Sequence, residues 1–176
     1  MNTNKKKHFF KMIITQGSRF ADAYNIMHVE DILPDQVFRA QGKPFEWCVR
    51  FDASGQVCPG VPVFSQEPVI HFCDNAIDLL MWYYKGWDGP VYNETYFFEV
   101  EPIGAIYKNQ CNDKNHFWQC GANKIKIVRQ VSFGELLRVA SDEIKQNLDE
   151  IINRYPEHNM LKLILHVKNN AHITSK

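Results

Sequence analysis

The stretch that decides the fold is Pro68–Trp87, PVIHFCDNAIDLLMWYYKGW. It begins with an apolar run through Cys73 that includes a β-branched pair, which is typical of a buried strand. Asp74 and Asn75 interrupt this run, and either side chain can accept free N–H groups at the start of a helix. Apolar residues then recur at helical spacing from Ala76 onward. The stretch therefore predicts a strand that leads directly into a helix.

The junction between this strand and helix could hold a ligand. A helix N-terminus offers unpaired N–H groups and partial positive charge to an anionic or amide group. His71 and Cys73 are two residues apart near the end of the strand, so an extended backbone places both on one face. A cysteine before a helix fits a nucleophile with a lowered pKa, although no orienting group or oxyanion hole can be identified. A packed, inert strand–helix unit is the alternative reading.

Length and composition predict one ordinary globular domain. The chain has 176 residues, of which 45% are hydrophobic and 23% are charged. We expect a polar leader with the first apolar segment over residues 1–15. A single α+β domain over residues 16–176 then ends in a long helix and a final apolar element. Its 20 basic and 20 acidic residues give no net charge, which does not favour a nucleic-acid partner but does not exclude one.

Cysteine content and apolar patterning indicate a cytoplasmic protein, with a host cytoplasm included in that expectation. Five cysteines are an odd number, and no secretory leader is recognisable, so reduced thiols are the simplest account. No apolar run approaches the length of a membrane span, and we expect no membrane partner.

Periodicity along the rest of the chain predicts several short strands and a helical end. The predicted strands cover residues 36–41, 45–51, 95–101, which Pro102 closes, and 124–131. Helices are predicted over residues 20–28 and from the Ser132/Glu135 capping box to Pro156, and residues 109–122 are predicted to form a polar loop. Residues 8–15 and 160–167 are apolar segments whose pattern does not distinguish a strand from a helix. That order indicates an α+β fold with a compact, strongly bent antiparallel or mixed sheet and flanking helices.

Two further groups of residues carry candidate chemistry. Cys111, His116 and Cys120 are ligand types that zinc accepts, but no C-x2–4-C pair accompanies them, so we assign no metal. Glu99 and Glu101 fall on one face of a predicted strand, where a carboxylate beside a ribose could stabilise positive charge during glycosidic cleavage. A solvent-facing polar strand edge is the alternative for that pair.

Three segments together resemble known proteins. IHFCDNAIDLLMWYY, TYFFEVEPIGAIY and NKIKIVRQVSFGELL are similar to a family of small, uncharacterised phage and bacterial proteins, over roughly residues 36 to 138. More remotely, the order resembles the small ADP-ribosyltransferases of the rifampin-modifying type. Their motifs correspond to Phe38–Ala40, Ile70–Cys73, Val100–Ala105 and Ile125–Val131. The resemblance implies an ADP-ribosyltransferase-like fold with a cleft between two small sheets.

The resemblance also implies roles for individual residues. NAD would be the substrate, and ADP-ribose would pass to an unknown acceptor such as a host protein. Arg39, His71 and Glu101 would be the catalytic residues, with Glu101 stabilising an oxocarbenium-like transition state. The cofactor-binding residues would be Phe38, Phe72, Trp82 and Tyr83. The acid expected after the E-P-x-G turn is missing, since Tyr107, Lys108 and Asn109 occupy that region. This departure favours an alternative, a non-enzymatic phage or bacterial protein that binds and modulates a host protein.

Overall fold

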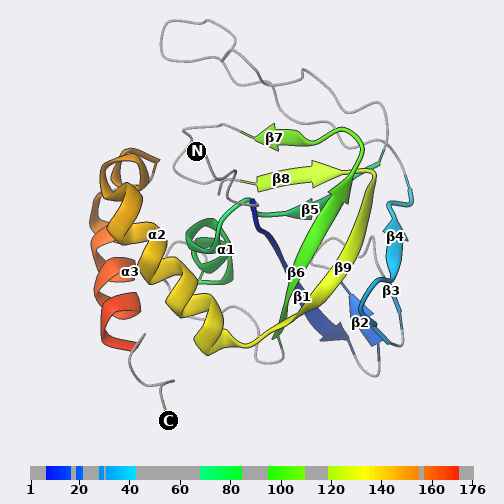
Figure 1. The fold of residues 1–176 in the computed structure, drawn as a ribbon, viewed down its shortest axis with the longest axis horizontal. Coiled ribbons are helices and arrows are strands. Elements are labelled where there is room, and N and C mark those ends of the chain that lie inside the picture. Colours follow the sequence, from blue (N-terminus) through cyan, green and yellow to red (C-terminus); the bar gives the residue numbers. More distant parts are fainter. Residues whose placement is uncertain are drawn as a thin grey trace, which may run out of the picture.

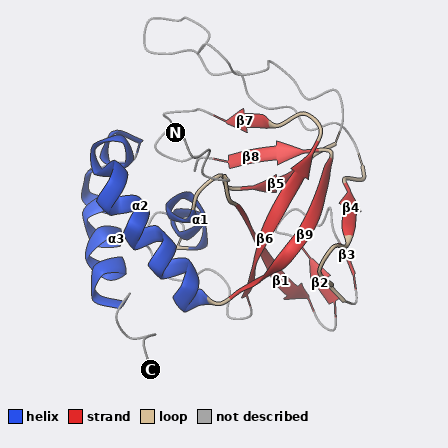
Figure 2. Ribbon diagram, in the orientation of Figure 1, coloured by secondary structure: helices blue, strands red, loops and turns tan. Residues whose placement is uncertain are grey.

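The computed structural model describes residues 7–16, 19–21, 28–29, 31–42, 68–84, 95–109, 119–154 and 157–170. These residues form two antiparallel sheets and three helices (Figure 1). The helices lie together on one side of the strands (Figure 2). The predicted α+β class and bent sheet are therefore confirmed.

The larger sheet has six strands in the order β3-β2-β1-β6-β9-β4. Its strands are β1 (Phe9–Gln16), β2 (Arg19–Ala21), β3 (His28–Val29), β4 (Val37–Arg39), β6 (Thr95–Ile103) and β9 (Lys124–Val131). Its longest pairings join β1 to β6 and β6 to β9, so these three strands form its centre. Among the described residues, β4 lies at one edge.

The smaller sheet has three strands in the order β5-β8-β7. Its strands are β5 (Ile70–Phe72), β7 (Tyr107–Asn109) and β8 (Gln119–Ala122). Cys73, directly after β5, exchanges two backbone hydrogen bonds of 2.7 and 2.8 Å with Phe10 of β1. The buried Lys11 ammonium also donates to the His71 carbonyl at 2.8 Å. These contacts join the small sheet to the large one, so that the strands curl around a shared interior.

The concave side of this curl is filled by apolar side chains, which we call the interior cluster. It consists of Ile13, Phe38, Ala40, Ile70, Phe72, Phe98, Val100, Cys120, Ala122, Ile125 and Ile127. Because strand side chains alternate between two faces, the neighbours of these residues point to the convex side. On β4, β5, β6 and β9, a residue whose neighbour along the strand belongs to the interior cluster therefore points to the convex side.

The convex side of the large sheet is covered in part by the helices. These are α1 (Ala76–Tyr83), α2 (Phe133–Arg154) and α3 (Glu157–Asn170). A second apolar group, the helix cluster, joins them to the strands through Phe10, Met12, Phe97 and Val131. Helix α1 begins as predicted, because the Asn75 side chain accepts the Asp78 N–H at 2.7 Å.

A bulge changes the facing of residues along β9. Glu99 pairs with Arg129, whereas Val100 pairs with Ile127, so Val128 has no partner across the ladder. Ile127 consequently points into the interior cluster, while Val131, four residues further on, belongs to the helix cluster. In a strand without a bulge, two residues four apart would face the same side.

Several predicted elements need correction. Residues 20–28 were expected to be helical, but Arg19–Ala21 and His28–Val29 are strands, because β2 finds backbone partners in β1 and β3 finds them in β2. Pro102 does not close its strand: β6 continues to Ile103. Pairing with β1 ends at Val100, so the missing proline N–H leaves no bond unmade on that side.

The remaining elements mostly follow the sequence pattern. The open-type segment at residues 8–15 is a strand, and the one at 160–167 is part of a helix. Residues 119–122 of the predicted polar loop form β8. The long helix begins at its capping box, where the Ser132 hydroxyl accepts the Glu135 N–H at 3.1 Å. The predicted strand at residues 45–51 lies outside the described residues.

Candidate functional site

The three side chains predicted to be catalytic all point away from the interior of the curl. Arg39 follows Phe38, His71 lies between Ile70 and Phe72, and Glu101 follows Val100; each named neighbour belongs to the interior cluster. Alternation therefore turns Arg39, His71 and Glu101 to the convex side. A convex surface spreads neighbouring side chains apart, so the described structure does not bring these three around one cavity.

Their surroundings differ as well. The His71 side chain is buried, with 6% of its surface exposed, and both ring nitrogens are shielded from solvent. Glu101 is exposed and forms an ion pair with Lys126 at 2.6 Å. Arg39 is exposed on β4, two strands from Glu101. The catalytic roles of these residues stay predictions.

The four residues predicted to bind the cofactor are divided between the two apolar clusters. Phe38 and Phe72 are buried in the interior cluster. Trp82 and Tyr83 pack against the helix cluster, where the Tyr83 ring meets that of Phe97 edge-on at 5.4 Å. Since the large sheet separates the two clusters, these rings do not line a common pocket. Their cofactor-binding role also stays a prediction.

The nucleophile reading of Cys73 is not favoured by its environment. Cys73 is buried in the helix cluster. Burial, more than the nearby Asp78 carboxylate, raises the pKa of the Cys73 thiol well above its ordinary value. The expectation of a lowered pKa is therefore wrong, because desolvation of the thiolate outweighs the helix N-terminus.

Metal binding finds no site within the described ranges. There, no group of three or more His, Cys, Asp or Glu side chains has the spacing to hold an ion. Cys120 is buried in β8 and forms no disulfide within the described residues. Cys111 and His116, the other two residues considered as zinc ligands, lie outside the described residues.

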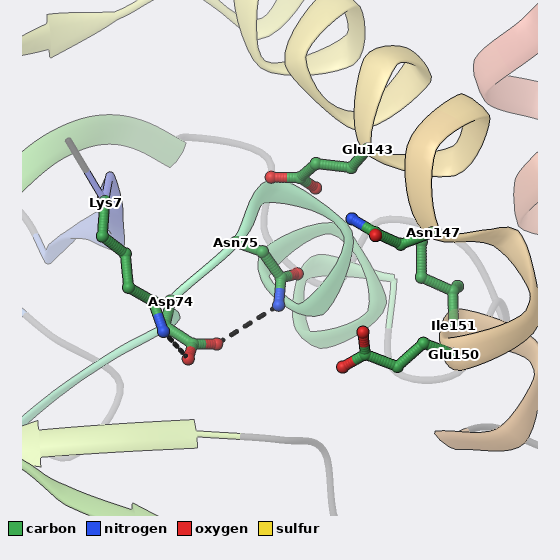
Figure 3. Close-up of a pocket in the computed structure, with 7 residues that line it drawn as sticks. All are labelled: Lys7, Asp74, Asn75, Glu143, Asn147, Glu150 and Ile151. Atoms are coloured by element: carbon green, nitrogen blue, oxygen red, sulfur yellow. Dashed lines mark hydrogen bonds and ion pairs between the residues drawn. The ribbon is translucent and has the colours of Figure 1, made fainter. Parts of the chain in front are cut away.

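A pocket of about 160 Å³ opens at the N-terminus of α1 (Figure 3). Its lining is polar apart from one residue and consists of Lys7, Asp74, Asn75, Glu143, Asn147, Glu150 and Ile151. None of the seven was predicted as a catalytic or cofactor-binding residue. The Lys7 ammonium bonds to the Asp74 carboxylate at 2.7 Å, and Asn75 donates to Asp74 and Asp78 at 3.2 and 2.6 Å.

Glu143 of α2 occupies the end of α1 that a ligand would need. Its carboxylate accepts the N–H groups of Ala76 at 2.9 and 3.0 Å and of Ile77 at 3.0 Å. The backbone of α2 departs from helical geometry at Asn147, one turn further along. Burial raises the pKa of Glu143 to about 7, although the two backbone bonds act in the opposite direction. The helix N-terminus is thus filled by the protein's own carboxylate.

A second buried carboxylate, Glu99, is also held by internal partners. Glu99 is only 6% exposed. It bonds to the His8 ring at 2.6 Å and to the Arg129 guanidinium at 2.9 Å. Arg129 in turn forms two bonds, of 3.0 and 2.7 Å, to Glu135 in the first turn of α2. This chain of bonds fastens the N-terminal strand, β6, β9 and α2 together, and its partners leave little of Glu99 for a substrate.

The part of the convex face that the helices leave uncovered forms an exposed strip across β4, β9 and β6. It consists of Val37, Arg39, Glu101, Ile103, Lys124 and Lys126. Cross-strand pairing sets Val37 beside Lys126 and Arg39 beside Lys124. Val37 is 52% exposed and Ile103 is 40% exposed. The alternation of KIKI in β9 predicts two outward lysines, but only the tertiary structure reveals the apolar residues beside them.

Comparisons with known proteins give no further guide. No family model matches the chain, and neither the curated proteins nor the solved structures contain a match. Within the part of the chain that the structure describes, no helix has the length and apolar character that crossing a membrane requires.

Proposed function

We propose that the protein is a non-enzymatic interaction protein that binds a partner protein through the exposed strip. The observation that carries this proposal is the exposure of Val37 and Ile103 on one sheet face. The same face buries its apolar side chains under helices only a few residues away, at Phe97. Val37 and Ile103 lie at opposite corners of the strip with Lys124 and Lys126 between them, so the strip offers a partner both apolar and charged contacts. The resemblance to phage proteins makes a host protein the expected partner.

The placement of the predicted catalytic residues is the reason for preferring binding to catalysis. A transferase needs its arginine, histidine and glutamate around one nicotinamide ribose, whereas here Glu101 is engaged by Lys126 and His71 is buried. We expect calorimetric titration with NAD to show no binding. Saturable binding of NAD that is lost in Glu101→Ala would restore the transferase hypothesis.

A binding experiment with matched variants tests the interaction proposal. The tagged protein is used to capture partners from bacterial lysate, alongside the double variant Val37→Asp, Ile103→Asp. The control is Leu165→Asp, since Leu165 is 60% exposed on α3, far along the chain from the strip. We expect a partner retained by the wild type and by the control but lost by the double variant, with equal melting temperatures.

Two results would contradict the proposal. The first is a partner that the double variant retains. The second is a partner lost only by Leu165→Asp, which would move the binding surface to α3.

A further inference from the structure

We infer that the partner presents an extended, acidic segment that pairs with the edge strand β4 and places carboxylates on Arg39 and Lys124. This inference deepens the proposed function and rests on it. It is carried by the charge of the exposed strip and by the backbone of β4.

The first observation is an unbalanced pair of cations. Arg39 and Lys124 are direct cross-strand neighbours, an arrangement of like charges that works against strand pairing. Within the described residues, neither forms an ion pair. By contrast Lys126, two residues along β9, is paired with Glu101 at 2.6 Å, and this hydrogen bond is the main cause of the raised pKa of Lys126.

The strip therefore carries three cations and one carboxylate. A partner that supplies carboxylates beside Arg39 and Lys124 would relieve their mutual repulsion. Electrostatic complementarity of this kind selects a partner and its register.

The second observation is the direction of the β4 backbone. Ala40 donates to Asn123, and Gln36 accepts from Ile127, so Phe38 occupies the hydrogen-bonded position between them. In an antiparallel pair the alternate residues direct their N–H and C=O groups away from the partner strand. For β4 these are Val37 and Arg39, the two residues whose side chains belong to the exposed strip.

No other described strand pairs with this edge of β4. An added strand would therefore satisfy the outward backbone groups and extend the exposed strip by one strand. Its alternate side chains would lie beside Val37 and Arg39, which suits a segment with apolar and acidic residues on the same face. Because β4 has only three residues, side-chain contacts should contribute as much to binding as the backbone hydrogen bonds do.

Selection from a displayed random-peptide library provides the test. The wild-type protein is used as bait, and binding of the enriched peptides is then measured by fluorescence anisotropy. We expect an acidic consensus with at least one apolar residue. The double variant Arg39→Gln, Lys124→Gln should weaken these peptides about tenfold, as two exposed charge contacts would. Lys126→Gln is the matched control and should change affinity less than about twofold.

Two further readouts separate a binding role from a structural one. Because like charges face each other, Arg39→Gln, Lys124→Gln should melt at the same or a higher temperature than the wild type. Methylation of the peptide amide nitrogens that face β4 should abolish binding, whereas methylation of those that face away from β4 should leave binding unchanged.

The possible outcomes distinguish this inference from the proposed function. Peptides without acidic bias that still require Val37 and Ile103 would overturn the acidic-segment inference and leave the interaction function standing. Peptides that bind equally well when Val37 and Ile103 are both replaced by Asp, or the absence of any enriched peptide, would overturn both.

Discussion

Replacing Glu143 by glutamine should remove a pH dependence from the stability of the fold. Glu143 caps α1 from the neighbouring helix, accepting N–H groups of Ala76 and Ile77. Burial raises its pKa from an ordinary 4.5 to about 7, with smaller contributions from Asp78 and Asp74. Glutamine keeps an oxygen that can accept a backbone N–H but carries no ionisable proton.

The sign and size of the effect follow from this pKa. Between pH 4.5 and about 7, folded Glu143 keeps a proton that the unfolded chain has largely released. Stability therefore falls as the pH rises through this range, and the loss is complete above pH 7. A shift of this size corresponds to at most about 3 kcal/mol of unfolding free energy.

Urea denaturation of both proteins at about pH 5 and about pH 8 measures this effect. The unfolding free energy of the wild type minus that of Glu143→Gln should be lower at the higher pH by about 2.5 kcal/mol, because a small part of the change already occurs below pH 5. Taking the difference cancels the titrating groups that do not interact with Glu143. Asp142→Asn is the control, since Asp142 is exposed on the same helix and, among the described residues, pairs only with the exposed Lys145. A wild-type to Glu143→Gln difference that is equal at both pH values would refute the reasoning.

Three further outcomes are expected. Arg129→Ala should lower the unfolding free energy by about 1–2 kcal/mol in urea, because it removes a charged hydrogen bond from buried Glu99; an unchanged midpoint would contradict this. Asn75→Ala should cost about 1 kcal/mol by removing the N-cap of α1, and Asn75→Asp should not restore this stability in urea, because an aspartate cannot donate hydrogen bonds to Asp74 and Asp78. Cys73 and Cys120 are buried thiols, so mass spectrometry after alkylation should find both unmodified in the native protein and labelled in denaturant, and rapid native labelling of either would show that its strand opens.

The strand–helix unit was predictable because its determinants are local. The β-branched residues before Cys73, the cap at Asn75 and the helical spacing of the apolar residues all lie within one short stretch, and the structure places β5 and α1 there. The capping box at Ser132 fixed the start of α2 for the same reason. By contrast β2 and β3 were missed, since β2 pairs with β1 and β3 pairs with β2, and these backbone partners outweigh the helical spacing of the apolar residues over 20–28.

The environment of charged residues was not predictable from the pattern. Glu99 and Glu101 share a strand face, yet Glu99 is buried among His8 and Arg129 while Glu101 is exposed beside Lys126. The difference arises from where the helices end on the sheet. The capping role of Glu143 likewise depends on the packing of α2 against α1, which has no signature in the spacing of either segment.

The unpaired Val128 marks a point of β9 that should tolerate change both in the identity and in the number of residues. Many side chains should be accepted at this partly exposed position, since no cross-strand partner constrains it. Deleting it would let β9 pair with β6 without a bulge and would keep the facing of the flanking residues, because Ile127 and Arg129 would then be adjacent and alternate between the two sides. Homologues of this chain should therefore vary at this point both in the identity of the residue and in whether it is present.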